Sequence, residues 1–289
     1  LSNSSAAQAS LTRYILTSSL KPAFVIDPVA PVQQRPPPLM QELRSQLPLY
    51  PVFMPADDLD YLLPPGSGAG LSDGHYASQG LADSLAPAAQ TLERPDFLFD
   101  ELEPLDGPYG LIPSVIAEQK RRFGKGVSAV LLRKAFRQGE LQCHRDLQRW
   151  LLNWECAQFG EAALQPESRA YVDGSFLCAG PGLVVLLPVR HSWEAFAHLL
   201  WWGSQWHFPA KIAALRRWHE RYGAELCCAG ITTLYLQIKR RPACLEEAFE
   251  LAIEHWYFAR DTLVLPGISL REHARVLLGQ DHWYFHQRP

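Results

Sequence analysis

Proline is distributed so unevenly along this chain of 289 residues that it divides the sequence before any other feature is considered. Residues 1–113 hold 16 of the 23 prolines. Proline has no backbone N–H and fixes φ, so it interrupts helices and is excluded from most positions inside a sheet. Regular helices and strands are therefore expected mainly after residue 113.

The first third is predicted to be a proline-rich, partly irregular region covering residues 1–113. The stretches "QQRPPPL" and "LLPPGSGAGLSDGHYASQG" are expected to be loops, because Pro and Gly prevent continuous runs of hydrogen-bonded backbone. Two short apolar pieces, "FVIDPV" and "LYPVFM", are candidate strands. The region is also acidic, with five basic and ten acidic residues up to Asp100.

The next segment, residues 114–179, changes to a helical pattern. The stretches "SVIAEQKRRFG", "SAVLLRKAFRQG" and "ELQCHRDLQRWLLNWECAQFG" repeat apolar residues at intervals of three to four. Each stretch ends in Gly, which is the residue most common just after a helix C-terminus. A short helical middle segment of three helices is therefore predicted.

This helical segment also carries a local excess of positive charge. Between Lys120 and Arg149 there are nine basic and two acidic residues. Such a surface can bind nucleic acid or an acidic protein, or it can be a solvated helix face. Nucleic-acid binding is not expected, because the formal net charge of the chain is −3 and no aromatic stacking platform accompanies the basic residues. The candidate basic patch consists of Lys120, Arg121, Arg122, Lys125, Arg133, Lys134 and Arg137.

The last third, residues 180–289, has the clearest pattern and is predicted to be an α/β domain of the α+β type. Its segments read in the order strand, helix, helix, strand, strand, helix, helix, strand. That order implies a mixed or antiparallel sheet flanked by helices. Within it, Leu245, Phe249, Ile253, Trp218 and Tyr222 are expected to be buried.

The stretch "LRRWHERYGAEL", from Leu215 to Leu226, could build structure or perform chemistry. It lacks the second histidine of H-E-x-x-H, because position 223 is Gly, so no zinc pair is formed. We expect Trp218 and Tyr222 to pack toward the sheet and Arg216 and Glu220 to pair outside. His219, near the helix C-terminus, suits the negative end of the helix dipole.

Two helix starts in this last third are predicted from their caps. Ser192 is placed to cap the helix "SWEAFAHLLWW". Ser269 and Glu272 stand at capping-box spacing at the start of "SLREHARVLLG", where each could satisfy a free backbone N–H.

The runs "LPVRHSWEAFAHL", "ALRRWHERYGAEL", "TLYLQIKRRPACLEEAFELA" and "HWYF" resemble a bacterial family called domain of unknown function 4253. The resemblance covers about residues 186–285, a third of the chain. No reaction is established for that family, so the resemblance implies a fold and no activity.

This chain departs from the family pattern at three places with polar or catalytic potential. The family has a Gly-Gly-Trp-Asn turn where this chain reads "WWGSQWHFP". It has Cys-Pro-Asp where this chain has Ala259-Arg260-Asp261, and a Trp-Trp-Asp tail where this chain ends "HQRP". These differences lower the expectation of a shared active site.

Other catalytic motifs are incomplete. The stretch "CHRDLQRWLLN" contains H-R-D-L, but Leu151 occupies the position at which a kinase has Asn. The stretch "GSGAG", residues 66–70, follows Pro64-Pro65 and precedes no amphipathic helix, so it lacks the context of a phosphate-binding loop. No nucleophile elbow G-x-S-x-G is present.

Metal sites are weakly indicated, and no cofactor is expected. His282 and His286 are four residues apart and would share one face of a strand, with His273 and Asp281 near in sequence. The acidic group Asp57, Asp58 and Asp60 could hold a metal or act in acid–base catalysis. A pair of terminal histidines and a solvated acidic turn are the favoured interpretations.

An aromatic turn, "HLLWWGSQWHF", motivates the leading functional hypothesis. Aromatic clusters provide interface anchors, so we expect a non-enzymatic protein-binding module with a cognate protein partner. By analogy, that partner is a bacterial toxin that the protein neutralises, or a secreted effector for which the protein serves as an adaptor. The alternatives are a metal-dependent hydrolase or nuclease and an RNA-associated protein using the 120–149 helices. The candidate interface residues are Trp201, Trp202, Trp206, His207 and Phe208.

The cysteine content and the lengths of the apolar runs indicate in which compartment the protein is expected. Six cysteines without a framework spacing suggest buried thiols in a reducing compartment, so a cytoplasmic location is expected. No run of 18 apolar residues is present, so no membrane span is expected. Because the chain begins at Leu1, we expect that a segment upstream has been removed, and a signal or anchor there would make the location periplasmic.

Overall fold

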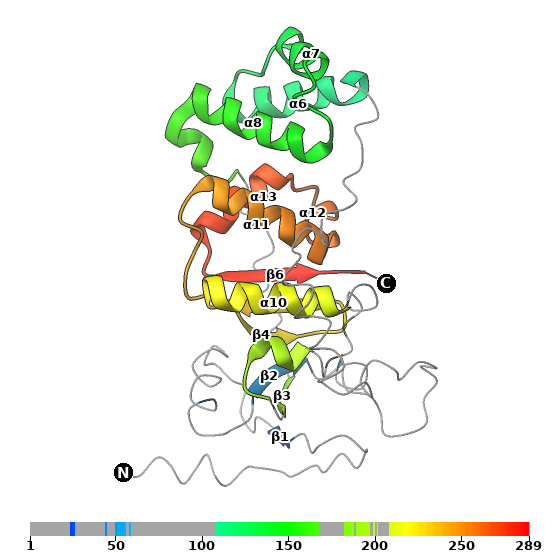
Figure 1. Cartoon of the computed structure of the whole chain (residues 1–289), viewed down its shortest axis with the longest axis vertical. Helices are drawn as coiled ribbons and strands as arrows, with labels where there is room; N and C mark the ends of the chain where they lie inside the picture. Colours follow the sequence, from blue (N-terminus) through cyan, green and yellow to red (C-terminus); the bar gives the residue numbers. More distant parts are fainter. Residues whose placement is uncertain are drawn as a thin grey trace.

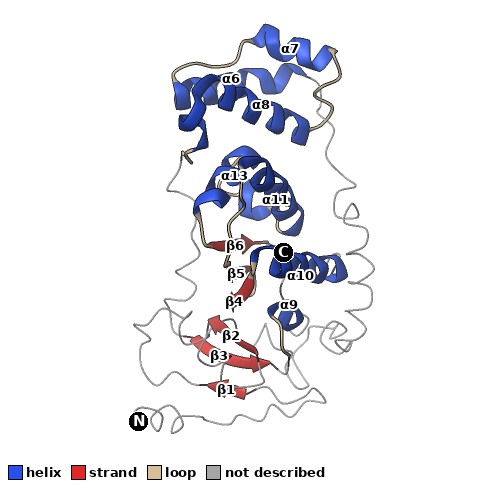
Figure 2. Cartoon of the chain, turned by 60° about the vertical axis from the view of Figure 1, so that its left-hand side comes forward, coloured by secondary structure: helices blue, strands red, loops and turns tan. Residues whose placement is uncertain are grey.

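A mixed sheet flanked by helices forms the centre of the molecule, and three further helices lie at one end of it (Figures 1 and 2). The computed structural model describes residues 24–26, 44, 50–55, 58, 108–167, 182–187, 189–196, 199, 201 and 208–288. The predicted fold class and the predicted helical middle are both confirmed.

The sheet contains six strands among the described residues, in the order β1-β3-β2-β4-β5-β6. Every neighbouring pair is antiparallel except β2 and β4, which run parallel. The bounds are β1 Phe24–Ile26, β2 Tyr50–Pro55, β3 Gly182–Leu187, β4 Glu225–Ala229, β5 Thr233–Gln237 and β6 His282–His286. The single parallel pair makes the sheet mixed.

Strand β2 lies inside the sheet although it comes from the proline-rich first third. It pairs along its whole length with β3 but with β4 only at Phe53 and Cys228. Proline is tolerated in this inner strand because few ladder bonds to β4 are required of it. The predicted strands in "FVIDPV" and "LYPVFM" are thus confirmed, and the sheet extends beyond residues 180–289.

The helices follow the predicted order, but α9 covers only the first four residues of the predicted helix "SWEAFAHLLWW", and the 3-10 helix η3 Gly160–Leu164 is an addition. Their bounds are α6 Pro108–Phe123, α7 Ala129–Arg137, α8 His144–Phe159, α9 Ser192–Ala195, α10 Phe208–Tyr222, α11 Leu245–Phe258, α12 Asp261–Val264 and α13 Leu270–Gly279. The short α12 was not predicted. None of the helices in the described part of the chain is long and apolar enough to cross a bilayer.

Glycine ends four of these helices as the sequence predicts. Gly124, Gly139, Gly160 and Gly223 all have positive φ, between 55° and 75°. An L side chain rarely adopts this conformation, so glycine is the residue that lets the chain turn away there.

One of the two predicted caps is wrong and the other is half confirmed. Ser192 is the buried first residue of α9, and His191 occupies the cap position instead. Ser269 Oγ does accept the backbone N–H of Glu272, at 3.3 Å. The Glu272 carboxylate does not return to Ser269 but accepts the backbone N–H of Glu167 at 2.5 Å.

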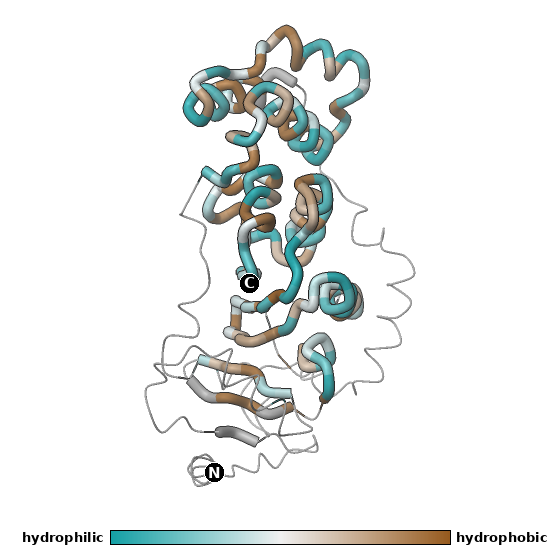
Figure 3. The backbone as a smooth tube through the Cα atoms, turned by 90° about the vertical axis from the view of Figure 1, so that its left-hand side faces the viewer, coloured by the Kyte–Doolittle hydropathy of each residue, from teal (hydrophilic) through white to brown (hydrophobic). Residues whose placement is uncertain are grey.

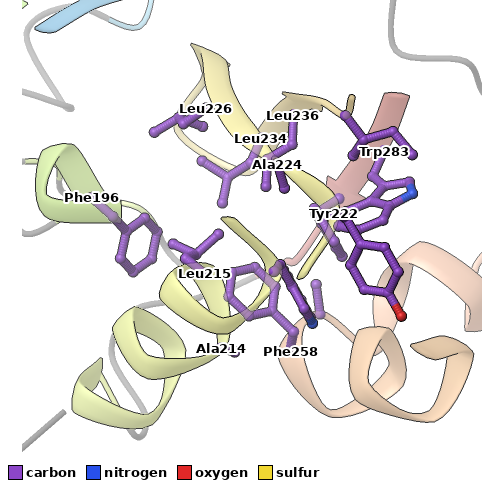
Figure 4. Packing of buried hydrophobic residues seen from close by; sticks show 14 of the residues in the cluster. Phe196, Ala214, Leu215, Tyr222, Ala224, Leu226, Leu234, Leu236, Phe258 and Trp283 are labelled. Carbon is purple, nitrogen blue, oxygen red and sulfur yellow. The ribbon is translucent and has the colours of Figure 1, made fainter. Parts of the chain in front are cut away.

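The main core joins α10 and α11 to the sheet through aromatic side chains (Figure 4). The rings of Trp218 and Tyr222, on α10, meet Trp283 of β6 edge to face, with centroids 5.6 Å and 5.4 Å apart. Phe249 and Ile253 of α11 are also buried, as predicted. Leu245 is only partly buried and packs against the edge of this core.

Residues 108–167, called the helical unit below, have a second core of their own. Its buried residues are Ile112, Val115, Val127, Leu132, Ala135, Leu141, Leu147 and Leu151, which come from α6, α7, α8 and the turns between them. Polar and apolar stretches alternate along these helices (Figure 3). The unit is inserted in the sequence between β2 and β3, which are neighbours in the sheet.

Candidate interaction surface

The Trp-His-Glu sequence of α10 builds structure, as predicted. Trp218 is fully buried, and its indole Nε1 donates to the Glu254 carboxylate at 2.5 Å. Glu220 pairs with Arg216 at 3.0 Å on the outer face of the helix. The indole and the carboxylate of this motif are therefore both committed to packing and pairing.

His219, near the C-terminal end of α10, is partly buried. Its Nδ1 lies 3.1 Å from the carbonyl oxygen of Ala224. Burial lowers the pKa of His219 below its usual value, and the carbonyl contact only partly opposes that shift. The neutral imidazole is thus favoured, although the negative end of the helix would favour the charged form.

The other weak catalytic candidates also have structural roles where they are described. Asp146 of the H-R-D-L stretch accepts the backbone N–H groups of Gln142 and Cys143, at 3.2 Å and 3.3 Å, at the start of α8. Asp58 accepts the backbone N–H of Ile231 at 3.1 Å. Asp57, Asp60 and the "GSGAG" stretch lie outside the described residues.

The two terminal histidines lie on β6 but are engaged separately. His282 Nδ1 is 2.9 Å from the Asp281 carboxylate, and its ring stacks on Tyr235. The backbone N–H of His286 donates to Thr262 Oγ1 at 2.9 Å. Among the residues that the structure describes, no group of three or more His, Cys, Asp or Glu side chains is arranged to hold a metal.

A buried histidine pair escaped the sequence analysis. His255 Nδ1 lies 3.0 Å from His273 Nε2, and both side chains are completely buried. Burial, reinforced by the charge of His273, lowers the pKa of His255 far below its usual value, and burial lowers the pKa of His273 to about 3. His273 is therefore part of the core and is not grouped with His282 and His286.

The aromatic turn is only partly described. Trp201 is 1% exposed, and its ring packs on Phe196 and Phe258 with centroids 5.9 Å and 5.5 Å apart. This indole therefore fills the core and does not present a surface. The side chains of Trp202, Trp206, His207 and Phe208 lie outside the described residues.

Lys211, next to Trp201, is a buried cation that the sequence did not single out. Its Nζ donates to the carbonyl oxygen of Phe258, the last residue of α11, at 2.7 Å. Burial lowers the pKa of Lys211 to about 7. The ammonium lies over the rings of Trp201 and Phe258, so the amine is a helix-end contact inside the core.

Within the part of the chain that the structure describes, the residues of the basic patch fall into two groups, those that contact polar groups of the same chain and those that do not. Arg121 forms two contacts with the Glu167 carboxylate, and Arg122 pairs with Glu272 of α13 in a half-buried contact. Lys125 Nζ lies 3.4 Å from the Gln158 side-chain oxygen. On α8, Arg145 and Arg149 also pair with carboxylates, those of Asp146, Glu246 and Glu250. These five cations are thus wholly or partly committed within the chain.

Arg122 belongs to a buried polar network between the helical unit and α13, which we call the seam. Arg271 Nε donates to Glu155 at 3.1 Å, and its Nη1 donates to the Gln148 oxygen at 2.6 Å. Arg275 pairs with Glu155 as well, and its Nε donates to the Ala163 carbonyl oxygen at 2.5 Å. The seam balances three arginines with three glutamates: Arg122, Arg271 and Arg275 with Glu118, Glu155 and Glu272.

Of the remaining basic residues of the patch, Lys120 is exposed on α6, and Arg133, Lys134 and Arg137 lie on the solvent-facing side of α7. Val130, Arg133, Lys134 and Arg137 follow one another at helical spacing and are all exposed. The opposite side of α7 packs through Leu132 and Ala135, which are buried. Within the described part of the chain, Arg133, Lys134 and Arg137 form no ion pair and no side-chain hydrogen bond.

Apolar side chains accompany these charges. Val130 is 74% exposed, the largest exposure of a big apolar side chain in the described residues, and Leu131 is 39% exposed. No acidic residue lies within α7. We call Val130, Leu131, Arg133, Lys134 and Arg137 the α7 face.

Comparison with known proteins assigns a family to the C-terminal part of the chain. Residues 183–286 form a DUF4253 domain, a domain of unknown function. No curated protein and no solved structure matches the chain. The family domain begins at residue 183, well after the end of α7 at Arg137.

Proposed function

We propose that this protein is a non-enzymatic protein-binding module that contacts its partner through the helical unit. The observation that carries the proposal is the α7 face, where exposed aliphatic side chains stand among cations that have no partner within the described chain. Exposed apolar groups that are rimmed by polar residues are typical of contact sites between proteins.

The roles of the polar residues elsewhere also support binding in preference to catalysis. Glu254, Asp146 and Asp58 accept hydrogen bonds that hold helices and turns in place. A general acid, base or nucleophile must instead be able to reach a substrate. These three carboxylates are therefore better explained as structural groups.

We propose a bacterial toxin or a secreted effector as the class of partner. Under this proposal the protein neutralises the toxin or delivers the effector by occupying its surface. The argument is an analogy with family-specific bacterial domains that lack catalytic residues. The family assigned to residues 183–286 carries no activity that competes with it.

The experiment is cross-linking of the tagged full-length chain inside cells that make it, followed by purification and mass spectrometry. We expect one protein to be enriched over an unrelated bait with the same tag, and the purified chain to hydrolyse neither nucleotides nor esters. A chain that captures no protein and turns over one of these substrates would overturn the proposal.

A further inference from the structure

The chemistry of the α7 face indicates the kind of partner that it fits. Its cations, Arg133, Lys134 and Arg137, lie on a single stripe with Val130. A helix rises about 1.5 Å per residue, so the stripe from 130 to 137 spans roughly 10 Å. Three positive charges around one aliphatic side chain therefore occupy an area that a single element of another protein can cover.

The cations of the α7 face differ from the arginines of α6 and α8. Arg121, Arg122 and Arg149 each have a carboxylate of the same chain within contact distance. Arg133, Lys134 and Arg137 have none among the described residues, so no carboxylate of the described part of the chain compensates their charges. Carboxylates from another molecule can supply that compensation without displacing any contact that the chain makes itself.

The exposed aliphatic side chains favour a protein over a nucleic acid. A phosphate backbone uses cations and polar groups, whereas single strands also need exposed aromatic rings on which bases can stack. The aromatic residues beside α7 do not provide such rings, because Phe123 stacks on Phe159 and Phe136 packs against the core of the helical unit. Val130 and Leu131 gain from contact with apolar groups, which a phosphate backbone does not offer.

We infer that the α7 face docks an acidic protein surface in which carboxylates surround an apolar side chain. This inference rests on the proposed function and specifies its contact site and its partner chemistry. Arg133 and Arg137 pair with carboxylates, Lys134 adds a third positive charge, and Val130 lies against the apolar side chain at the centre of the contact.

The test begins with capture at a defined position of the full-length chain. A photo-crosslinking amino acid replaces Val130 in one variant and Arg241, an exposed residue outside the helical unit, in another. Both are irradiated in cells that make the protein. We expect an adduct with one acidic protein from position 130 and none with that protein from position 241.

The captured protein is then purified, and its Kd is measured with three forms of the chain. The α7 variant carries Arg133→Glu, Lys134→Glu and Arg137→Glu. The control variant carries the same change in charge at three other exposed arginines, as Arg190→Glu, Arg241→Glu and Arg288→Glu. We expect the α7 variant to raise the Kd at least about tenfold and the control to change it less than about threefold, because only close charges contribute strongly to affinity.

Each other outcome contradicts a defined part of the account. A nucleic acid as the main adduct at position 130, or equal losses in the α7 and control variants, would overturn the inference. If a partner is captured by the whole chain but binds the α7 variant normally, the inference fails and the proposed function stands. If no cross-linking position captures a protein, the proposed function fails as well.

Discussion

The chain holds its helices in place in two opposite ways. Helix α10 meets the sheet through aromatic rings, with Trp218 stacked on Phe285 and edge to face with Trp283. Helix α13 meets the helical unit through the seam, where Arg271 and Arg275 converge on Glu155. An apolar contact loses stability in proportion to the volume that is removed, whereas a buried ion pair fails when either partner is lost.

This difference suggests different tasks for the two contacts. The aromatic core supplies stability, because burial of apolar surface is the main favourable contribution to folding. The seam contributes little net stability, because the attraction between its charges is largely offset by the cost of taking them out of water. We expect it instead to fix how the helical unit is docked on α13.

The largest expected effect is in the aromatic core. Trp218→Ala removes a fully buried indole that touches α11 and β6. We expect the free energy of unfolding to fall by about 4 kcal/mol, as for other large-to-small core changes. Urea denaturation followed by circular dichroism measures it, and a loss under about 1 kcal/mol would show that the core collapses around the gap.

The second effect distinguishes a polar seam from an apolar one. Glu155→Gln leaves Arg271 and Arg275 buried without their shared carboxylate, so we expect a loss of about 3 kcal/mol. The matched variant Glu155→Leu/Arg271→Met/Arg275→Met removes this carboxylate together with the two arginines that share it, and is expected to lose much less. Denaturation of both proteins checks this, and an equal loss would mean that shape, not charge, governs the contact.

The third effect concerns the buried histidine pair. The pKa of both His255 and His273 is lowered in the folded chain. Below the ordinary histidine pKa, the unfolded chain therefore binds more protons at these two residues than the folded chain does. The contribution of this pair to stability should therefore be constant above about pH 7 and fall as the pH decreases from the ordinary histidine pKa of about 6.5 toward 3. Denaturation midpoints at a series of pH values test this, and an unchanged midpoint down to pH 4 would contradict it.

A fourth and smaller effect comes from Lys211. Its pKa of about 7 lies below the ordinary lysine value, so the unfolded chain again binds the extra proton. Stability should rise with pH from about 7 to about 10 through this group. Lys211→Met should remove that rise, and the difference between the two denaturation series measures it. A rise of the same size in the variant would assign it to other groups.

Much of the fold was predictable because it follows from local patterns. The glycines at positions 124, 139, 160 and 223 end helices as predicted, and the apolar periodicity of α11 marks its buried side. The place of β2 in the sheet was not predictable. Its partner β3 lies more than a hundred residues away, and the proline in "LYPVFM" would favour an edge strand over an inner one.

The contacts between helices that are distant in the sequence could not be predicted from the sequence. Arg271 and Arg275 are spaced like any polar side of a helix, and only the structure brings them against Glu155. One signal was available in α8, where Gln148 and Glu155 stand one heptad apart on the same side as Leu151 and Leu152. The α7 face was visible as part of the basic patch, but which of its cations are paired was not.

The measurement that tests the central claim most directly is hydrogen–deuterium exchange of the full-length chain with and without its captured partner. We predict that exchange slows most in residues 129–137 and at the adjoining end of α6, while the amides of α10 and β6 keep their rates. Slowing confined to other elements, with α7 unchanged, would contradict the assignment of the α7 face as the binding surface.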